Sequence, residues 1–289
     1  MGVTYLNEVE GIPVVMCSGE GGMPPSILKS RYIKYFILQI ASGYFGWDEI
    51  IHALPEMKED PCAIEIKYGQ GAKPGDGGLL QAYKVLGLIA KIRGVPQFVD
   101  LASPPTHQTK YSIEESVAKM IQSMYMAWGF RVPVYPKISA TSTTNAVLNN
   151  LTRNPYAAGL AIDGEDGGTG AAYNVSMDKM GHPIASNIRD CYLDLVKQGK
   201  ILYVGISDAP AWWSARANTI AELRSLTPFA GIQVEYNLIE RTPERELIPM
   251  ARSLAMACNA CNTCFSNSMQ SRICNGCGTG ASNRTSESR

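Results

Sequence analysis

Short apolar segments that suit β-strands alternate with helix-spaced segments along most of the chain. Strands are expected just before Ser18 and at residues 35–41, 64–67, 97–101, 132–138, 159–163, 200–206 and 232–236. Helices are expected at 79–93, from Ser112 onward, and at 141–150, 184–198, 211–225 and 243–255. This alternation predicts an α/β fold with a parallel sheet. About eight such units suit a closed (β/α)8 barrel of TIM type, composite or incomplete in its units.

The segment over residues 64–78 carries the strongest functional signal. It reads as a buried strand that ends at Lys67 and runs straight into a loop. Between residues 69 and 78 the loop holds five glycines and one proline, so neither regular element can continue. Glycine lacks a Cβ, which lets such a backbone approach a ligand closely. Lys67, Gln70 and Lys73 suit an anionic or electron-rich ligand. The alternative is a surface turn with solvated lysines.

Polar residues also follow other expected strands. Glu20 lies in a second glycine-rich loop, Lys137 stands near the end of the strand at 132–138, and residues 164–170 form a third glycine-rich stretch. Parallel α/β proteins bind ligands at the carboxyl ends of their strands. We therefore expect these segments to meet at one barrel mouth. Taken alone, Glu20 and Lys137 also suit solvated surface positions.

Charge and hydropathy narrow the class of partner. The formal net charge is zero, which provides no electrostatic basis for binding nucleic acid or a membrane surface. No apolar run reaches the roughly 18 residues that a spanning helix needs. The first residues show no basic segment followed by an apolar one, so no signal peptide is expected. A cytoplasmic location is the default expectation.

The cysteines are distributed unevenly. Three are scattered, whereas five fall within 20 residues near the C-terminus, at Cys258, Cys261, Cys264, Cys274 and Cys277. The first three form a CxxCxxC pattern and the last two a CxxC pattern, and paired spacing of this kind lets thiolates reach one metal from a tight turn. An iron–sulfur cluster, a zinc site and free thiols all remain open. We take Cys258, Cys261, Cys264 and Cys274 as the candidate metal ligands.

Six motifs occur in an order that is specific when taken together. They are Ser18-Gly-Glu-Gly-Gly-Met-Pro-Pro25, Gln39-Ile-Ala-Ser-Gly-Tyr-Phe-Gly46, Lys67-Tyr-Gly-Gln-Gly-Ala-Lys-Pro-Gly75, Ser103-Pro-Pro105, Tyr111-Ser-Ile-Glu-Glu115 and Asp163-Gly-Glu-Asp-Gly-Gly-Thr-Gly-Ala171. Over about residues 10–190, the chain resembles the FMN-binding synthase domain of glutamate synthases. That resemblance implies a (β/α)8 barrel in which reduced FMN delivers a hydride to 2-iminoglutarate. The imine forms from 2-oxoglutarate and ammonia, and the product is glutamate.

The resemblance also implies roles for single residues. Lys67 and Gln70 would lie along the isoalloxazine ring and the oxoacid, and Lys137 would be a second cation over flavin or substrate. A cation near the flavin stabilises the negative charge of the reduced ring. Glu20 would be a polar or acid–base group near the imine. Gly167 and Gly168, in the last motif, would contact the cofactor.

The same family carries a three-iron four-sulfur cluster on a Cys-x5-Cys-x4-Cys pattern just after its barrel. Cys258 and Cys264 have the first spacing, and Cys274 would be the third ligand, five residues late. No glutaminase domain is visible in this chain. Any use of glutamine as the ammonia source would therefore need a partner subunit, as would an external electron donor.

A second resemblance covers about residues 196–255. The stretches 199–208 and 233–246 are similar to the middle of the aldo-keto reductases, a barrel family that binds NADPH. Ser207, Asp208 and Gln233 match positions that hold the nicotinamide carboxamide, which needs both donors and acceptors. The catalytic Tyr, Lys, Asp and His of that family have no counterparts here, so we do not expect carbonyl reductase activity.

The chain thus reads as a hybrid of two barrel families. We expect a synthase-like portion over residues 1–195, reductase-like βα units over 196–256, and a Cys-rich segment with a disordered tail over 257–289. Three functions compete: an FMN-dependent oxidoreductase of the glutamate synthase type, an NADPH-binding reductase-like protein, and a barrel without catalysis.

Overall fold

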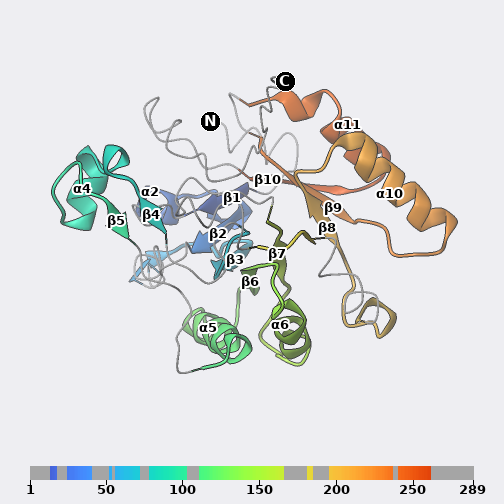
Figure 1. The fold of residues 1–289 in the computed structure, drawn as a ribbon, viewed down its shortest axis with the longest axis horizontal. Coiled ribbons are helices and arrows are strands. Elements are labelled where there is room, and N and C mark those ends of the chain that lie inside the picture. Colours follow the sequence, from blue (N-terminus) through green and yellow to red (C-terminus); the bar gives the residue numbers. More distant parts are fainter. Residues whose placement is uncertain are drawn as a thin grey trace, which may run out of the picture.

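The fold is seen in a computed structural model, which describes residues 14–17, 25–40, 52–53, 56–71, 78–102, 111–165, 181–184, 195–236 and 240–261. Eight parallel strands form one sheet in this part of the chain (Figure 1). They are β1 (Val14–Cys17), β2 (Phe36–Ile40), β3 (Ala63–Lys67), β6 (Val134–Ser139), β7 (Ala161–Asp163), β8 (Gly205–Ser207), β9 (Gly231–Val234) and β10 (Ala257–Cys261). None of the helices described there is long and apolar enough to cross a membrane.

The order of the strands in the sheet is compatible with a barrel. Read across the sheet it is β7-β6-β3-β2-β1-β10-β9-β8, so the first strand lies between the second and the last. A (β/α)8 barrel with its strands in sequence order has this arrangement once it is opened between β7 and β8. The mixed α/β architecture with a parallel sheet is therefore confirmed. No β7–β8 pairing is present among the described strands, so closure is not shown.

One face of the sheet is covered by helices. Leu38, Ile40, Ile64 and Ile66 point to this face and join a single apolar core with residues of α5 (Ile113–Ala127). Helices α6 (Thr144–Leu151), α10 (Ala211–Leu223) and α11 (Leu247–Ser253) lie along the same sheet (Figure 1). Each such fully buried side chain contributes about 1.5–3 kcal/mol relative to an exposed one.

The other face is more polar. Because side chains alternate along a strand, Ile37 and Ala63 point away from the helices, and with Tyr135 they form a separate small apolar cluster. Gln39 and Glu65 follow them two residues further along β2 and β3 and are buried. This alternation places a layer of polar side chains on this face of the sheet, just before the carboxyl ends of the strands.

Helix α5 begins where the sequence indicates. The Ser112 hydroxyl accepts a hydrogen bond from the Glu115 amide, and the Glu115 side chain accepts one from the Ser112 amide. This reciprocal capping box satisfies amide groups that a helix start otherwise leaves without partners. The helix predicted over 141–150 is also confirmed, as α6, and that over 211–225 as α10.

Between β3 and β6 one predicted element is only partly confirmed and another is wrong. The segment at 79–93 is only partly helical: it holds β4 (Leu79–Leu80), a 3-10 turn over Ala82–Lys84 and α4 (Gly87–Arg93). The segment at 97–101 does not join the main sheet. Its end, β5 (Leu101–Ala102), pairs antiparallel with β4. Because this excursion has an apolar cluster of its own, around Val85 and Ile89, its strands do not need the main sheet to bury their side chains.

The eighth strand comes instead from residues 257–261. We expected Cys258 and Cys261 to stand in a tight ligand-binding turn, whereas both lie in β10 between β9 and β1. The expected strand at 200–206 is shortened to β8, and most of the helix expected at 184–198 lies outside the described residues.

Candidate functional site

Three strands bring charged side chains together at one end of the sheet. Lys67 of β3 aligns with Lys137 of β6, and Ser139 of β6 aligns with Asp163 of β7. The Lys137 Nζ atom lies 3.4 Å from Asp163 Oδ2, and these two side chains are only 22% and 19% exposed. An ion pair this far removed from water is stronger than one on an open surface.

Hydrogen bonds join the start of the glycine loop to the strands that carry this charged pair. The Tyr68 and Gly69 amides both donate to the Lys137 carbonyl, at 2.8 and 3.0 Å. The Ser139 hydroxyl donates to the Gln70 carbonyl, and the Gly71 amide donates to Asp163 Oδ2 at 3.2 Å. Gln70 is almost fully buried. The first turn of the loop therefore has a defined place above β6 and β7.

Residues 181–182 pack against this turn. The His182 amide donates to the Ala140 carbonyl and the Glu165 amide to the His182 carbonyl, both at 3.0 Å. A Cβ at Gly181 would overlap the Gly71 carbonyl oxygen and lie 3.0 Å from the Glu165 Cα and Cβ atoms. This close approach of two backbone segments explains the need for glycine at position 181.

The end of β8 approaches the same cluster from the other side of the unpaired β7–β8 edge. Ser207 aligns with Gln233 of β9, and the Asp208 amide donates to the Gln233 carbonyl at 3.4 Å. Burial raises the pKa of the Asp208 carboxyl, and the neighbouring Asp163 charge raises it further. A hydrogen bond with Ser207 and the charge of Lys137 oppose that shift. Lys137, Asp163 and Asp208 thus form one electrostatic group.

Below the lysines lies a buried polar pair. Gln39 Nε2 donates to Glu65 Oε1 at 2.5 Å, and the two residues are 5% and 3% exposed. Glu65 lies two residues before Lys67 in β3. Both side chains point to the inner face, because alternate residues of a strand share a face. A buried carboxylate needs partners of this kind because its transfer from water is costly.

The sequence-based candidates fall into two groups and a remainder. Lys67, Gln70 and Lys137 lie together at the ends of β3 and β6, while Ser207, Asp208 and Gln233 lie together at the ends of β8 and β9. Of the remaining candidates, Cys258 and Cys261 lie in β10. The others are outside the described residues, namely Glu20, Gly167, Gly168, Cys264 and Cys274.

The metal-ligand prediction stays a prediction. Cys258 is half-buried and packs against the apolar core, in the extended conformation of β10, and Cys261 ends the same strand. The described residues contain no group of three or more His, Cys, Asp or Glu side chains placed to hold a metal ion. Two of the four proposed ligands lie beyond these residues, so the complete set is not tested.

Sequence reasoning missed three residues of the site: Asp163, Ser139 and Glu65. Asp163 carried a usable signal, because it is the last residue of an expected strand and opens a glycine-rich motif. Ser139 follows the expected strand end by one residue. Glu65 is an acidic residue between two isoleucines, and that alternation alone would place it on the solvent side of an ordinary sheet.

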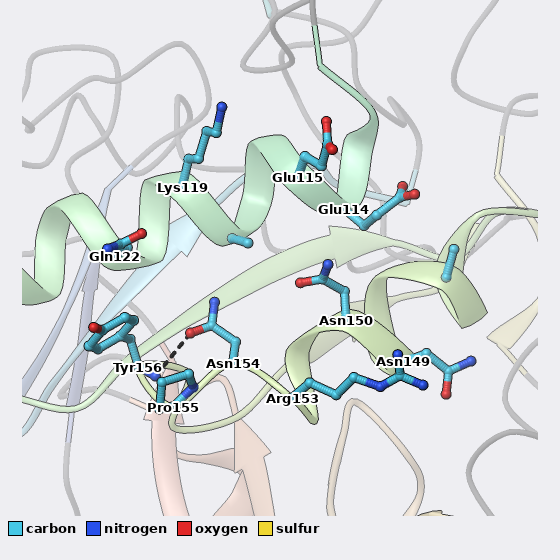
Figure 2. A pocket seen from close by; sticks show the side chains of 12 residues that line it. Glu114, Glu115, Lys119, Gln122, Asn149, Asn150, Arg153, Asn154, Pro155 and Tyr156 are labelled. Atoms are coloured by element: carbon cyan, nitrogen blue, oxygen red, sulfur yellow. Dashed lines mark hydrogen bonds between the residues drawn. The ribbon is translucent and has the colours of Figure 1, made fainter.

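A groove on the described surface lies away from these strand ends. A groove of about 600 Å³ runs between α5 and α6 and is lined by Glu114, Lys119 and Gln122 on one side and Asn150 and Arg153 on the other (Figure 2). None of its lining residues belongs to the Lys137 cluster. Residues 18–24, 41–51, 72–77 and 166–180, which lie in the connections after β1, β2, β3 and β7, are outside the described residues.

Comparison with known proteins gives two family matches. Residues 6–206 match the model of the conserved region in glutamate synthase, and residues 176–266 match that of the aldo/keto reductase family. The first match covers more than half of the chain, and the two overlap over residues 176–206.

Individual relatives agree with the first match. An archaeal glutamate synthase [NADPH] of Methanocaldococcus jannaschii is 38% identical over 182 residues, which are 63% of this chain and 34% of that protein. An archaeal-type glutamate synthase [NADPH] of Thermotoga neapolitana is 31% identical over 251 residues, 86% of this chain and 44% of that protein. A chloroplastic ferredoxin-dependent glutamate synthase of Oryza sativa subsp. japonica is 34% identical over 163 residues, 56% of this chain and 10% of that protein. The chain spans less than half the length of each.

Proposed function

The chain belongs to the family of the conserved region in glutamate synthase, and on that basis we propose that it is an FMN-dependent oxidoreductase of the glutamate synthase type. It would convert 2-iminoglutarate, formed from 2-oxoglutarate and ammonia with loss of water, to glutamate. The observation that carries this proposal is the pair of lysines, Lys67 and Lys137, aligned at neighbouring strand ends beside a glycine turn that Asp163 holds in place.

The described residues fit the electron-rich end of a flavin. Two half-buried cations stand side by side at the strand ends, next to the start of the glycine turn. The glycines at 167 and 168, which we propose contact the cofactor, stand just after β7 in sequence.

Each candidate residue would have its own role in this reaction. Bound FMN, once reduced, supplies the hydride. Lys67 and Lys137 would bind the substrate carboxylates and stabilise negative charge on the ring, in a site where few waters compete. Gln70 would orient the oxoacid. Glu20 would hold or donate the proton that accompanies the hydride, so that one hydride and one proton convert the imine to the amine.

Reconstitution tests the proposal directly. The purified chain is incubated anaerobically with FMN and desalted, and its visible spectrum is recorded. We expect flavin bands in wild type and at least tenfold weaker FMN binding in Lys137→Ala, because a cation beside the electron-rich edge of the ring is lost. Lys91→Ala, an exposed lysine of α4, is the matched control and should bind as wild type does. A chain that never takes up FMN would refute the proposal.

A second candidate function rests on a different observation. Ser207 and Gln233 are side by side on β8 and β9, and this part of the chain matches the aldo/keto reductase family. Together they offer the donors and acceptors that a nicotinamide carboxamide needs. If this pair binds NADPH, cofactor fluorescence should change on mixing, and Gln233→Ala should abolish the change. A colourless chain that also leaves NADPH fluorescence unchanged favours a barrel without catalysis.

The proposed reaction needs a source of electrons and a source of ammonia. The relatives named above are NADPH- or ferredoxin-dependent by name. We infer that electrons reach the flavin of this chain from a donor subunit, through an iron–sulfur cluster in the Cys-rich segment that includes Cys264 and Cys274, and that ammonia comes from solution or from a glutaminase subunit. Cys258 and Cys261 cannot both bind that cluster while they lie in β10, because side chains three residues apart in a strand point to opposite faces. Iron analysis after anaerobic reconstitution, compared with Cys264→Ser, tests the cluster. A zinc-loaded or metal-free product argues against it.

A further inference from the structure

One carboxylate oxygen joins the two parts of the lysine site. Asp163 Oδ2 lies 3.4 Å from the Lys137 ammonium and accepts the Gly71 amide at 3.2 Å. We propose that Asp163 is a positioning residue that sets the Lys137 side chain and the Gln70–Gly71 turn together. Its role in cofactor binding rests on the function proposed above. The coupling itself is a property of the free protein.

The backbone holds Asp163 where it can do this. Asp163 aligns with Ser139 at the end of β7, and its carbonyl accepts the Ala140 amide at 2.7 Å. The side chain is mostly buried, so it can rotate only into space that its neighbours leave. A hydrogen bond or ion pair to an ionised group in such a place is roughly twice as strong as a neutral one.

The turn is held from two strands at once. Ser139 bonds the Gln70 carbonyl from β6, and Asp163 bonds the Gly71 amide from β7. Only the second contact involves charge, and it uses the same oxygen that faces Lys137. Removing the charge of Asp163 should therefore change the fraction of Lys137 that is uncharged. Removing its oxygen should in addition weaken the hydrogen bond that holds the Gly71 amide.

Other charged groups around Lys137 provide a matched comparison. Lys67 stands beside it on β3, and Asp208 influences it electrostatically from the end of β8. The Gly71 amide bonds Asp163 and not Asp208. Asp208→Asn therefore removes one negative charge near Lys137 without removing an acceptor from the glycine turn.

Two substitutions separate charge from hydrogen bonding. Asp163→Asn keeps an acceptor oxygen of the same reach but has no charge, whereas Asp163→Ala has neither. Acylation of Lys137 with acetic anhydride, followed by mass spectrometry of the peptides, reports how much of the amine is uncharged. Hydrogen exchange at the Gly71 amide reports how firmly the turn is held.

On flavin-free protein, Asp163→Asn should increase the rate of Lys137 acylation about three- to tenfold and leave Gly71 exchange within about twofold of wild type. Asp163→Ala should change both, with Gly71 exchange faster by at least tenfold. Asp208→Asn should leave Gly71 exchange unchanged. If Asp163→Ala fails to fold, the paired results for Asp163→Asn decide the matter.

Two outcomes overturn the proposal: Lys137 acylation in Asp163→Asn equal to that of wild type, or Gly71 exchange in Asp163→Ala equal to that of wild type. FMN titration is a separate arm. A wild-type chain that binds no FMN removes the proposed function while the acylation and exchange results still stand. A wild type that binds FMN, with weaker binding in Asp163→Asn, shows that the positioning serves the cofactor.

Discussion

Gln39 donates a hydrogen bond of 2.5 Å to Glu65 across two neighbouring strands, and both residues are buried on the inner face of the sheet. Gln39→Leu should destabilise the protein by about 3 kcal/mol, because it leaves a buried carboxylate without this partner. Urea unfolding followed by circular dichroism measures the change.

The double variant Gln39→Leu/Glu65→Leu is the control for this pair. Because it removes the carboxylate as well, it should cost clearly less than the sum of the two single substitutions. Additive costs would contradict an energetic link between the two residues.

Asp208 has a backbone φ of 53°, in the left-handed region, where Asn and Gly fit more readily than most residues. Burial raises the pKa of its carboxyl, so its charge is unfavourable in the folded protein near neutral pH. Asp208→Asn should therefore raise the free energy of unfolding at pH 7 only slightly, because Asp208 is exposed and water screens most of this charge effect.

The pH dependence gives the sign of this effect. A raised pKa adds stability that is complete below the unfolded value of about 3.9 and is lost as the pH rises through the folded value. The advantage of Asp208→Asn should thus shrink as the pH falls from 7 towards 4. Thermal unfolding of both proteins across that range measures it, and an advantage that grows at low pH would show that the charge is favourable.

Ser112→Ala should destabilise the protein by about 1 kcal/mol. It removes the hydroxyl that accepts the Glu115 amide at the start of α5. Ser123→Ala, an exposed serine in the middle of the same helix, is the control and should be neutral or slightly stabilising because alanine is the better helix former. Equal losses in the two variants would rule out a specific role for the cap.

Gly181→Ala should cost about 1–3 kcal/mol, because the added methyl group would overlap the Gly71 carbonyl and crowd Glu165. Gly159→Ala provides the comparison, since the nearest atom to its new methyl group would be Tyr135 Cβ at 3.9 Å. Thermal unfolding of both variants distinguishes them. A tolerated alanine at 181 would mean that residues 181–182 can move off the glycine turn.

Local patterns in the sequence were sufficient for most of the elements that hold the site. The Ile64–Ile66 alternation marks β3, the Ser112–Glu115 pattern marks the start of α5, and the glycines after Lys67 mark the loop. Each depends on interactions between residues close in the chain. The same patterns misplaced the segment at 97–101, because a short apolar run looks alike in a barrel strand and in a small hairpin.

The sequence by itself determined that alternating strands and helices would form a parallel sheet with lysines and glycines at its strand ends. Only the tertiary structure decided that residues 257–261 become the eighth strand and that Asp163 faces both Lys137 and Gly71. The physical reason is how far apart in the chain the interacting residues lie. Periodicity and capping reflect contacts between near neighbours in the chain. Strand order and ion pairing depend on which distant segments bury one another, and no local pattern records that choice.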